Sequence, residues 1–294
     1  MSGPTDDPER ILLSIVEDYE RSRRLFADKS AEDAVDMPLK EALADLETEG
    51  SFDSERERAL YVTFNLTVNY RKPADRLARR VKGLWKEENW IFEPTQLVNE
   101  RGYYELLNLF KGQGEFQTHP VAEEHGLMEL GKTDVNYWYT VAHTLYNEHD
   151  SDPLALIAEH DDDALAVYNY VSEARSEEPA HEEIRTTKKF PGLGGEKIAP
   201  LWLRAIDDYV RPLDNIALLP LPVDRHTARL TNYLFGTNYS ADDEEDRAAI
   251  RDKYRRFCEQ HDVTSTRFDK ALWLIGENWT DGGRAYLDKK IAEQ

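Results

Sequence analysis

The sequence has few of the residues that form covalent or metal-bridged cross-links. Its 294 residues include one cysteine, Cys258. A single cysteine excludes a disulfide framework within the chain and any metal or iron–sulfur site built from four thiolates. The fold must therefore depend on a hydrophobic core, and the 40% of hydrophobic residues is enough to build one.

Long apolar runs are also absent. No stretch of about 18 consecutive apolar residues occurs, so we expect no membrane-spanning helix and no membrane partner. The sequence starts Met1-Ser-Gly-Pro, without the basic segment and the apolar segment of a secretory signal peptide. We therefore expect a cytoplasmic protein.

Basic residues are scarce relative to acidic ones. Lys and Arg number 37 and Asp and Glu number 58, which gives a formal net charge of −21. The acidic residues are spread along the chain rather than gathered in one tail, and this pattern indicates a surface adapted to high salt, as in halophilic archaea. Such a charge disfavours a polyanionic partner, unless the acidic residues cover only faces that do not bind it.

Two segments depart from this acidic background. The first basic segment, residues 71–86, contains Asp75 and these basic residues: Arg71, Lys72, Arg76, Arg79, Arg80, Lys82 and Lys86. The second basic segment, residues 185–204, contains Glu196 and these basic residues: Arg185, Lys188, Lys189, Lys197 and Arg204. Basic clusters in an acidic chain favour a nucleic-acid partner, with Arg76 and Arg79 as expected contacts to the DNA backbone. The alternative is a solvated helix face whose charges pair with neighbouring acids.

The spacing of apolar residues predicts an all-α fold. Helical periodicity predicts helices over these ranges: 8–28, 38–48, 54–70, 73–85, 95–110, 134–148, 153–159, 163–175, 197–210, 226–235, 246–260 and 267–276. The one strand-like alternation, over residues 215–219, is short and fits an extended connection better than a strand. We expect an N-terminal helical extension over residues 1–50 and a helical domain over residues 51–294.

Two further segments contain candidate catalytic residues. Residues 190–206, FPGLGGEKIAPLWLRAI, predict a proline–glycine turn that leads into an amphipathic helix, with Lys197 in its first turn. Gly192, Gly194 and Gly195 permit close approach of the backbone to a partner, and a helix N-terminus presents N–H groups that suit a phosphate. In residues 220–231, PLPVDRHTARLT, Asp224 directly precedes another helix, the position of an N-cap or a catalytic carboxylate.

This pairing resembles the helix-hairpin-helix DNA glycosylase superfamily, whose hallmark is L-P-G-h-G-x-K-h-A (h, apolar) followed by h-P-V-D-x-H-h-x-R. The residues that match the hairpin are Phe190, Pro191, Gly192, Leu193, Gly194, Lys197, Ile198 and Ala199. Those that match the second element are Pro222, Val223, Asp224, His226 and Arg229. The resemblance extends over residues 54–276 and implies a two-lobed helical fold with the helix-hairpin-helix over about residues 184–210.

In that family the hairpin grips the DNA backbone and the damaged nucleotide is flipped into a pocket between two helical lobes. The resemblance implies that Lys197 attacks the sugar C1′ to form a Schiff base, and that Asp224 stabilises charge on the departing sugar. It implies a monomeric base excision repair enzyme, a DNA N-glycosylase with AP lyase activity, that removes an oxidised base such as 8-oxoguanine. We expect no cofactor and no metal, and DNA-backbone contacts from these residues: Gly192, Gly194, Gly195, Lys188, Lys189, His226 and Arg229.

The sequence also departs from the family's pattern. Two residues, Gly195 and Glu196, separate the second glycine from Lys197 where the family has one, unless Gly195 itself takes the second-glycine position. The separation between Lys197 and Asp224 is longer than usual. Cys258 alone cannot supply the four-cysteine cluster of the endonuclease III branch, which points to the cluster-free branches.

Other interpretations stay open at this stage. Lys197 fits an ordinary exposed lysine, Asp224 fits a helix cap alone, and His226 fits a structural residue or a phosphate contact. The histidine–acid runs 148–150 and 159–161 lack a recognised metal-ligand spacing, and no P-loop, dinucleotide fingerprint or G-x-S-x-G elbow is present. Besides the glycosylase/lyase, the sequence allows a non-catalytic helix-hairpin-helix protein that binds nucleic acid, or a glycosidase acting on a modified nucleotide or RNA nucleoside.

Overall fold

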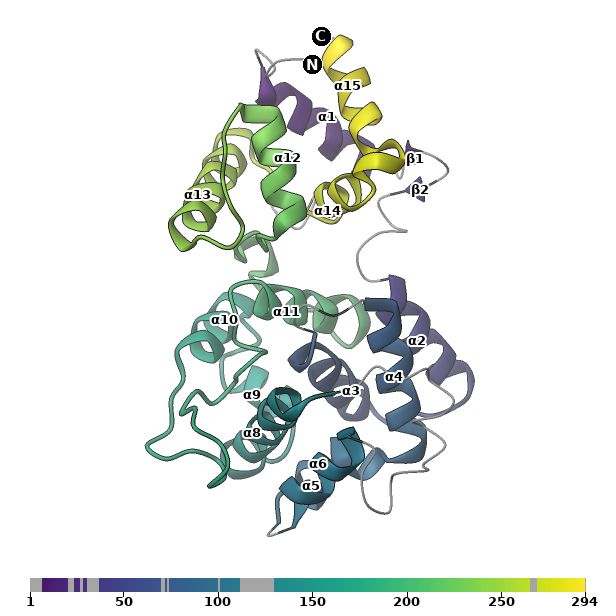
Figure 1. Cartoon of the computed structure of the whole chain (residues 1–294), viewed down its shortest axis with the longest axis vertical. Helices are drawn as coiled ribbons and strands as arrows, with labels where there is room; N and C mark the ends of the chain where they lie inside the picture. Colours follow the sequence, from purple (N-terminus) through teal and green to yellow (C-terminus); the bar gives the residue numbers. More distant parts are fainter. Residues whose placement is uncertain are drawn as a thin grey trace. The chain divides into compact units, whose positions relative to one another are not determined.

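The chain forms two compact helical units. The computed structural model describes residues 7–20, 24–26, 29–30, 37–69, 72, 74–99, 101–111, 130–264 and 269–293. The terminal unit combines the two ends of the chain, Met1–Met37 and Ala217–Gln294, and the central unit is Pro38–Ile216. Figure 1 shows the elements of each. None of the helices in the described ranges is both long enough and apolar enough to cross a bilayer.

The central unit is built around one helix, α3 (Glu55–Thr67), which is buried over its whole second half. It packs against α4 (Ala74–Glu87), α8 (Lys132–Glu148), α9 (Pro153–Ala158) and α11 (Ile198–Tyr209). The other elements of this unit are α2 (Met37–Thr48), η2 (Asn89–Phe92), α5 (Pro94–Leu97), α6 (Gly102–Lys111) and α10 (Ala164–Glu173). The division between the two units falls within the 3₁₀ turn η4 (Ile216–Leu218). A helix with apolar residues all round its surface is stable only when other helices surround it.

Two tryptophans join α3 to its neighbours. Trp138 of α8 stacks on Phe64, with ring centroids 4.7 Å apart. Trp202 of α11 donates its Nε1 hydrogen to Thr63 Oγ1 at 3.0 Å. Both indoles are fully buried, so they belong to the core of the central unit.

The terminal unit consists of α1 (Pro8–Glu20), β1 (Arg24–Phe26), β2 (Lys29–Ser30), α12 (Arg225–Phe235), α13 (Glu244–His261), α14 (Asp269–Glu277), the π-helical turn η6 (Trp279–Gly283) and α15 (Arg284–Ala292). Its core includes Ile11, Leu12, Ile15 and Val16 of α1, packed with apolar residues of α12 to α15. The N-terminal helix therefore completes the core of the C-terminal helices.

This packing changes the expected domain division. The expected extension over residues 1–50 is not one unit, because residues up to Met37 cluster with Ala217–Gln294 and the following residues belong to the central unit. The apolar face of α1 needs a partner surface, and the C-terminal helices supply it. The contacts of the chain therefore divide it after Met37 and not at residue 50.

The predicted all-α class is confirmed for the described residues, apart from the short antiparallel pair β1–β2. Strand β1 lies within the range of the helix expected over residues 8–28, because that helix, α1, ends at Glu20. The helix expected over 95–110 is interrupted, since Asn99 Oδ1 accepts hydrogen bonds from the backbone N–H groups of Arg101 and Gly102 and starts α6 anew. The segment 215–219 contains η4 rather than a strand, and α15 was not predicted.

Candidate catalytic residues and nucleic-acid interface

The turn before α11 is anchored in the core of the central unit. Phe190 and Leu193 are buried, and the Gly194 N–H donates to the Phe190 carbonyl at 2.7 Å. Gly192 has a φ of +79°, in the left-handed region that favours glycine. The Pro-Gly-Leu-Gly segment is thus a defined turn, as the sequence predicts.

Two of the three glycines are required by the chain's own packing. A Cβ on Gly192 would lie 2.3 Å from the Thr67 carbonyl oxygen, and a Cβ on Gly194 would lie 2.1 Å from the Val171 carbonyl oxygen. Gly195 differs, because it is exposed and its Cβ would meet only the Gly192 oxygen, at 3.6 Å. The close approach of the turn to α3 and α10 is therefore enough to explain why positions 192 and 194 are glycine. Gly195 is the most exposed of the three glycines.

The segment before the turn is not helical. Arg175 and Lys188 form an antiparallel bridge, and the Ser176 N–H donates to the Thr187 carbonyl at 2.8 Å. These bonds close a loop between Glu173, the last residue of α10, and the glycine turn. The expected helix-hairpin-helix over residues 184–210 is therefore wrong in its first half. The helices on either side of the turn are α10 and α11, which pack against each other.

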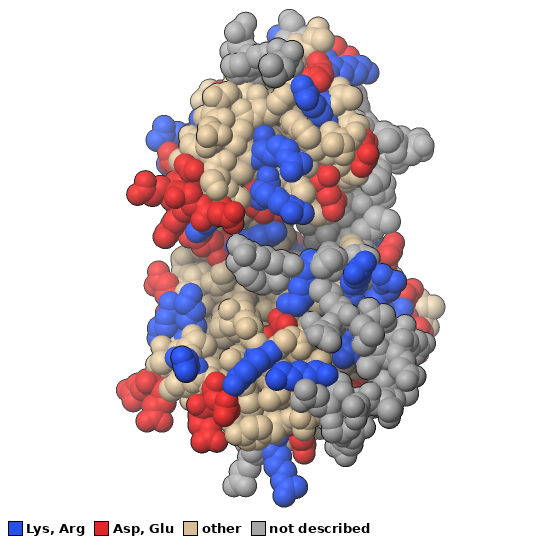
Figure 2. Space-filling model, viewed as in Figure 1, with Lys and Arg blue, Asp and Glu red and all other residues tan. Residues whose placement is uncertain are grey.

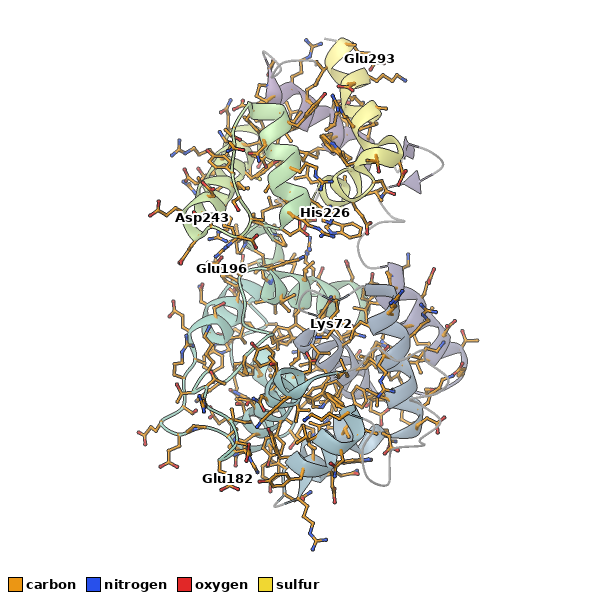
Figure 3. The ribbon with its side chains drawn as sticks, in the orientation of Figure 1. Lys72, Glu182, Glu196, His226, Asp243 and Glu293 are labelled. Atoms are coloured by element: carbon orange, nitrogen blue, oxygen red, sulfur yellow. The ribbon has the colours of Figure 1, made fainter. Side chains whose placement is uncertain are left out.

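Lys197 lies at the N-cap position of α11 and is exposed. The first helical hydrogen bond runs from the Ala199 N–H to the Gly195 carbonyl at 2.9 Å, so the helix begins directly after the glycines. Figure 3 labels the exposed carboxylate of Glu196 at this start. An external ligand can reach Lys197 here without movement of the core, and this exposure fits both the nucleophile and the ordinary surface lysine.

The other cations of the second basic segment differ in accessibility. Lys189 Nζ pairs with Glu148 Oε2 at 2.5 Å, and Arg204 is 6% exposed. Lys188 and Arg185 are exposed. The exposed cations of this segment are therefore Lys188, Arg185 and Lys197, and Lys189 forms an ion pair with Glu148 of α8.

The first basic segment is largely neutralised. Lys72 pairs with Asp134 at 2.5 Å, and Lys82 and Lys86 of α4 pair with Asp45 and Glu49 of α2. Arg80 is buried, and burial lowers its pKa. Arg76 and Arg79 are exposed, and Arg71 lies outside the described residues. The paired helix face is thus the observed arrangement for most of this segment, with Arg76 and Arg79 still accessible to a polyanion.

Asp224 caps α12. Its Oδ1 accepts hydrogen bonds from the backbone N–H groups of His226 at 2.9 Å and Thr227 at 3.1 Å. The cap interpretation is therefore confirmed, and it holds the carboxylate in one orientation at the start of the helix. Capping and catalysis are compatible, because a fixed orientation is what a catalytic carboxylate requires.

His226 and Arg229 both contact α14 or the segment after it. His226 is buried, its ring lies 5.8 Å from that of Trp273, and burial lowers its pKa (Figure 3). Arg229 is exposed, but its Nη1 donates to the Gly276 carbonyl at 3.2 Å. The burial of His226 and its contact with Trp273 favour a structural role for this residue over a contact to phosphate.

The two histidine–acid runs meet each other. Buried His149 pairs through Nδ1 with Glu159 Oε2 at 2.8 Å, and its Nε2 lies 3.4 Å from the Tyr170 hydroxyl. Burial, together with Glu148 and Glu159, raises the pKa of Tyr170 to about 12. Within the described ranges no three His, Cys, Asp or Glu side chains are arranged to hold a metal ion. The runs therefore form a hydrogen-bonded link between α8, α9 and α10.

The structure also brings Arg229, an expected DNA-backbone contact, together with two arginines that the sequence analysis did not select, Arg225 and Arg284. Arg225, Arg229 and Arg284 are all exposed, and the last two lie over aromatic rings: Arg229 over Trp279 and Arg284 over Tyr233. The four-residue spacing of Arg225 and Arg229 is visible in the sequence and places both on one helix face. Arg284 comes from α15, so only the tertiary structure could add it.

The two expected catalytic residues belong to different units: Lys197 to the central unit and Asp224 to the terminal unit. Comparison of the chain with protein-family models, with curated proteins and with solved structures found no match.

Proposed function

We propose that the protein is a DNA N-glycosylase with AP lyase activity that removes an oxidised base, such as 8-oxoguanine, from DNA. The observation that carries this proposal is the exposed Lys197, which follows a glycine turn at the start of α11. A second, separate observation supports it: the carboxylate of Asp224 is held in one orientation by the first turn of α12. These are the two residues that the resemblance to the helix-hairpin-helix glycosylases assigns to catalysis.

The chemistry uses Lys197 as the nucleophile. Its neutral amine attacks C1′ of the damaged nucleotide, the C1′–N bond breaks, and the base leaves with a proton. The lysine–sugar adduct opens to a Schiff base, from which loss of the 3′ phosphate by elimination cleaves the strand. Asp224 stabilises positive charge on the sugar and assists the proton transfers. Base extrusion costs a few kcal/mol, least for a damaged base.

The accessible cations support DNA as the substrate. Arg76, Arg79 and Lys188 are exposed in a chain with a net charge of −21. Contacts between such residues and phosphates supply sequence-independent affinity. In concentrated salt this electrostatic contribution is small, so non-electrostatic contacts must supply more of the affinity.

A non-catalytic nucleic-acid-binding protein is the second candidate. It is favoured by the observation that Gly192 and Gly194 are explained by packing against α3 and α10, and Asp224 by its cap. A binder needs the exposed cations but not the amine of Lys197. The two candidates therefore differ in one chemical step, the covalent attack on C1′.

Borohydride trapping tests that step. Duplex DNA with one 8-oxoguanine opposite cytosine is incubated with the protein in concentrated KCl and sodium borohydride, which reduces a Schiff base to a stable cross-link. We expect a covalent protein–DNA band that disappears in Lys197→Gln. The matched control is Lys132→Gln, because Lys132 is also an exposed lysine at a helix start but is not one of the residues assigned to the reaction. Its substitution should leave the band intact.

The outcomes separate the candidates. A band that persists in Lys197→Gln would refute Lys197 as the nucleophile. Base release detected after alkali, without a band, would indicate a glycosylase that does not form the lysine intermediate. DNA binding with neither band nor base release on a panel of oxidised bases would favour the non-catalytic protein.

A further inference from the structure

We propose that α12 and α15 carry a binding surface for the phosphate backbone of duplex DNA, formed by Arg225, Arg229 and Arg284. We call these three residues the arginine stripe. The proposal rests on the DNA partner proposed above and extends its contact surface to the terminal unit. It does not depend on catalysis by Lys197.

The geometry of the stripe is set by α12. Arg225, Arg229 and Tyr233 follow one another at intervals of four residues, so they lie on one face of the helix. The guanidinium of Arg229 lies 5.9 Å from the centroid of the Trp279 ring, and that of Arg284 lies 5.7 Å from the centroid of the Tyr233 ring. The two rings are themselves in edge contact, with centroids 5.1 Å apart.

This arrangement alternates cations with aromatic rings from three elements, α12, η6 and α15. Cation–π contacts hold a guanidinium over a ring face, which reduces the conformational freedom lost when it binds an anion. Arg229 is further fixed by its hydrogen bond to the Gly276 carbonyl. Arg229 and Arg284 are therefore held in place before any partner binds, and Arg225 Nε donates to His226 Nε2 at 3.3 Å.

The charges of the stripe are poorly balanced within the protein. In the part of the chain that the structure describes, no carboxylate oxygen lies within 4.0 Å of a side-chain nitrogen of Arg225 or Arg229. Arg284 has Asp288 at 3.8 Å, and Asp288 also accepts a hydrogen bond from the Tyr233 hydroxyl. By contrast, Arg255 and Arg256 of α13 each have a carboxylate within 2.6 Å.

Figure 2 shows the same contrast on the surface. Lys and Arg side chains form a column over the region of α12, whereas acidic side chains gather over the region where α13 begins. In a chain with 58 acidic residues, the absence of a described carboxylate within 4.0 Å of the exposed Arg225 and Arg229 points to an anion outside the protein.

Phosphodiesters fit this surface better than carboxylates of a protein partner. Guanidinium groups bind carboxylate and phosphate oxygens alike with two parallel hydrogen bonds, so the choice depends on the regular spacing of phosphates along a strand. Arginines one helical turn apart have Cβ atoms about 5–6 Å apart, so their long side chains can reach successive phosphates of one strand. The half-buried rings of Trp279 and Tyr233 add apolar area beside the charges.

The test measures how the affinity for undamaged duplex DNA depends on KCl concentration, by fluorescence anisotropy. The variant is the triple substitution Arg225→Gln, Arg229→Gln and Arg284→Gln. Each phosphate contact contributes about 0.9 to the slope of log K against log [KCl], so we expect the slope to fall by about 2–3. The matched control removes three exposed cations elsewhere in the same unit: Arg255→Gln, Arg256→Gln and Lys289→Gln. Its slope should equal that of the wild type.

A second variant guards against a folding defect, since Arg229 also joins α12 to α14. Arg225→Gln with Arg284→Gln leaves that hydrogen bond in place, and we expect its slope to fall by about 2. Unchanged slopes in both variants, with wild-type DNA binding intact, would overturn the stripe but leave the proposed function standing. Absence of DNA binding by the wild type would refute the proposed function itself. Loss of binding to polyglutamate but not to DNA would assign the stripe to an acidic protein partner and overturn this proposal.

Discussion

Gly276 of α14 and His226 of α12 approach so closely that a Cβ on Gly276 would lie 2.7 Å from the His226 Cβ. The contact lies two residues after Asp224, in the first turn of the helix that this carboxylate caps. The pairing of α12 with α14 therefore positions Asp224. A residue assigned to catalysis is held by a backbone contact to a helix about 50 positions further along the chain.

Burial of His226 makes the stability of the terminal unit depend on pH. Burial lowers the pKa of His226 below its usual value, so the unfolded state binds more protons between the folded and unfolded pKa values. Stability should therefore fall as the pH drops below about 6.5, and His226→Gln should reduce this dependence. Chemical unfolding between pH 5 and pH 7.5 in KCl, followed by tryptophan fluorescence, measures it. An identical pH profile in the variant would contradict this expectation.

Two adjacent glycines should respond differently to alanine. Gly194→Ala places a Cβ 2.1 Å from the Val171 carbonyl oxygen, which belongs to the backbone of α10 and has to move. We expect a loss of stability of about 1–3 kcal/mol. Gly195→Ala meets an ordinary contact of 3.6 Å and should change stability by less than about 0.5 kcal/mol. Denaturant titration of the two variants side by side measures the difference, and equal losses would show that the turn is less tightly packed.

Substitutions of Asp224 distinguish its role as the N-cap of α12 from its proposed catalytic role. Asn caps helices about as well as Asp, so Asp224→Asn should keep wild-type stability but slow base removal severely. Asp224→Ala removes the hydrogen bonds to His226 and Thr227 and should also cost about 0.5–2 kcal/mol. Unfolding curves and base release from 8-oxoguanine duplex are measured for both. Normal turnover by Asp224→Asn would remove Asp224 from the catalytic assignment.

The first basic segment should affect DNA binding only through its exposed arginines. Arg76→Ala with Arg79→Ala should weaken binding to any duplex and reduce the slope of log K against log [KCl] by about 2. Lys82→Ala with Lys86→Ala removes the same charge from the same helix, but these lysines pair with Asp45 and Glu49. That control should leave the slope unchanged. Equal effects of the two variants would mean that the ion pairs of Lys82 and Lys86 do not keep these lysines from DNA.

Most helices could be predicted from the sequence alone, because a helix with one apolar face repeats its pattern every 3.6 residues wherever it packs. The observed helices α10, α11 and α12, for example, begin and end within two residues of the ranges expected for them, 163–175, 197–210 and 226–235. Local chemistry also sufficed for the cap at Asp224 and for the turn at Gly192. These features depend on neighbours along the chain.

Only the tertiary structure decided which charges are available and which helices share a core. Lys82 is neutralised by Asp45, and Lys189 by Glu148, through contacts that no local pattern reports. The arginine stripe needs Arg284 from the end of the chain. In the same way, α1 joins the C-terminal helices because the apolar faces of both are buried only in contact with each other. Contacts between residues far apart in sequence depend on the packed fold, and a pattern read along one segment does not contain them.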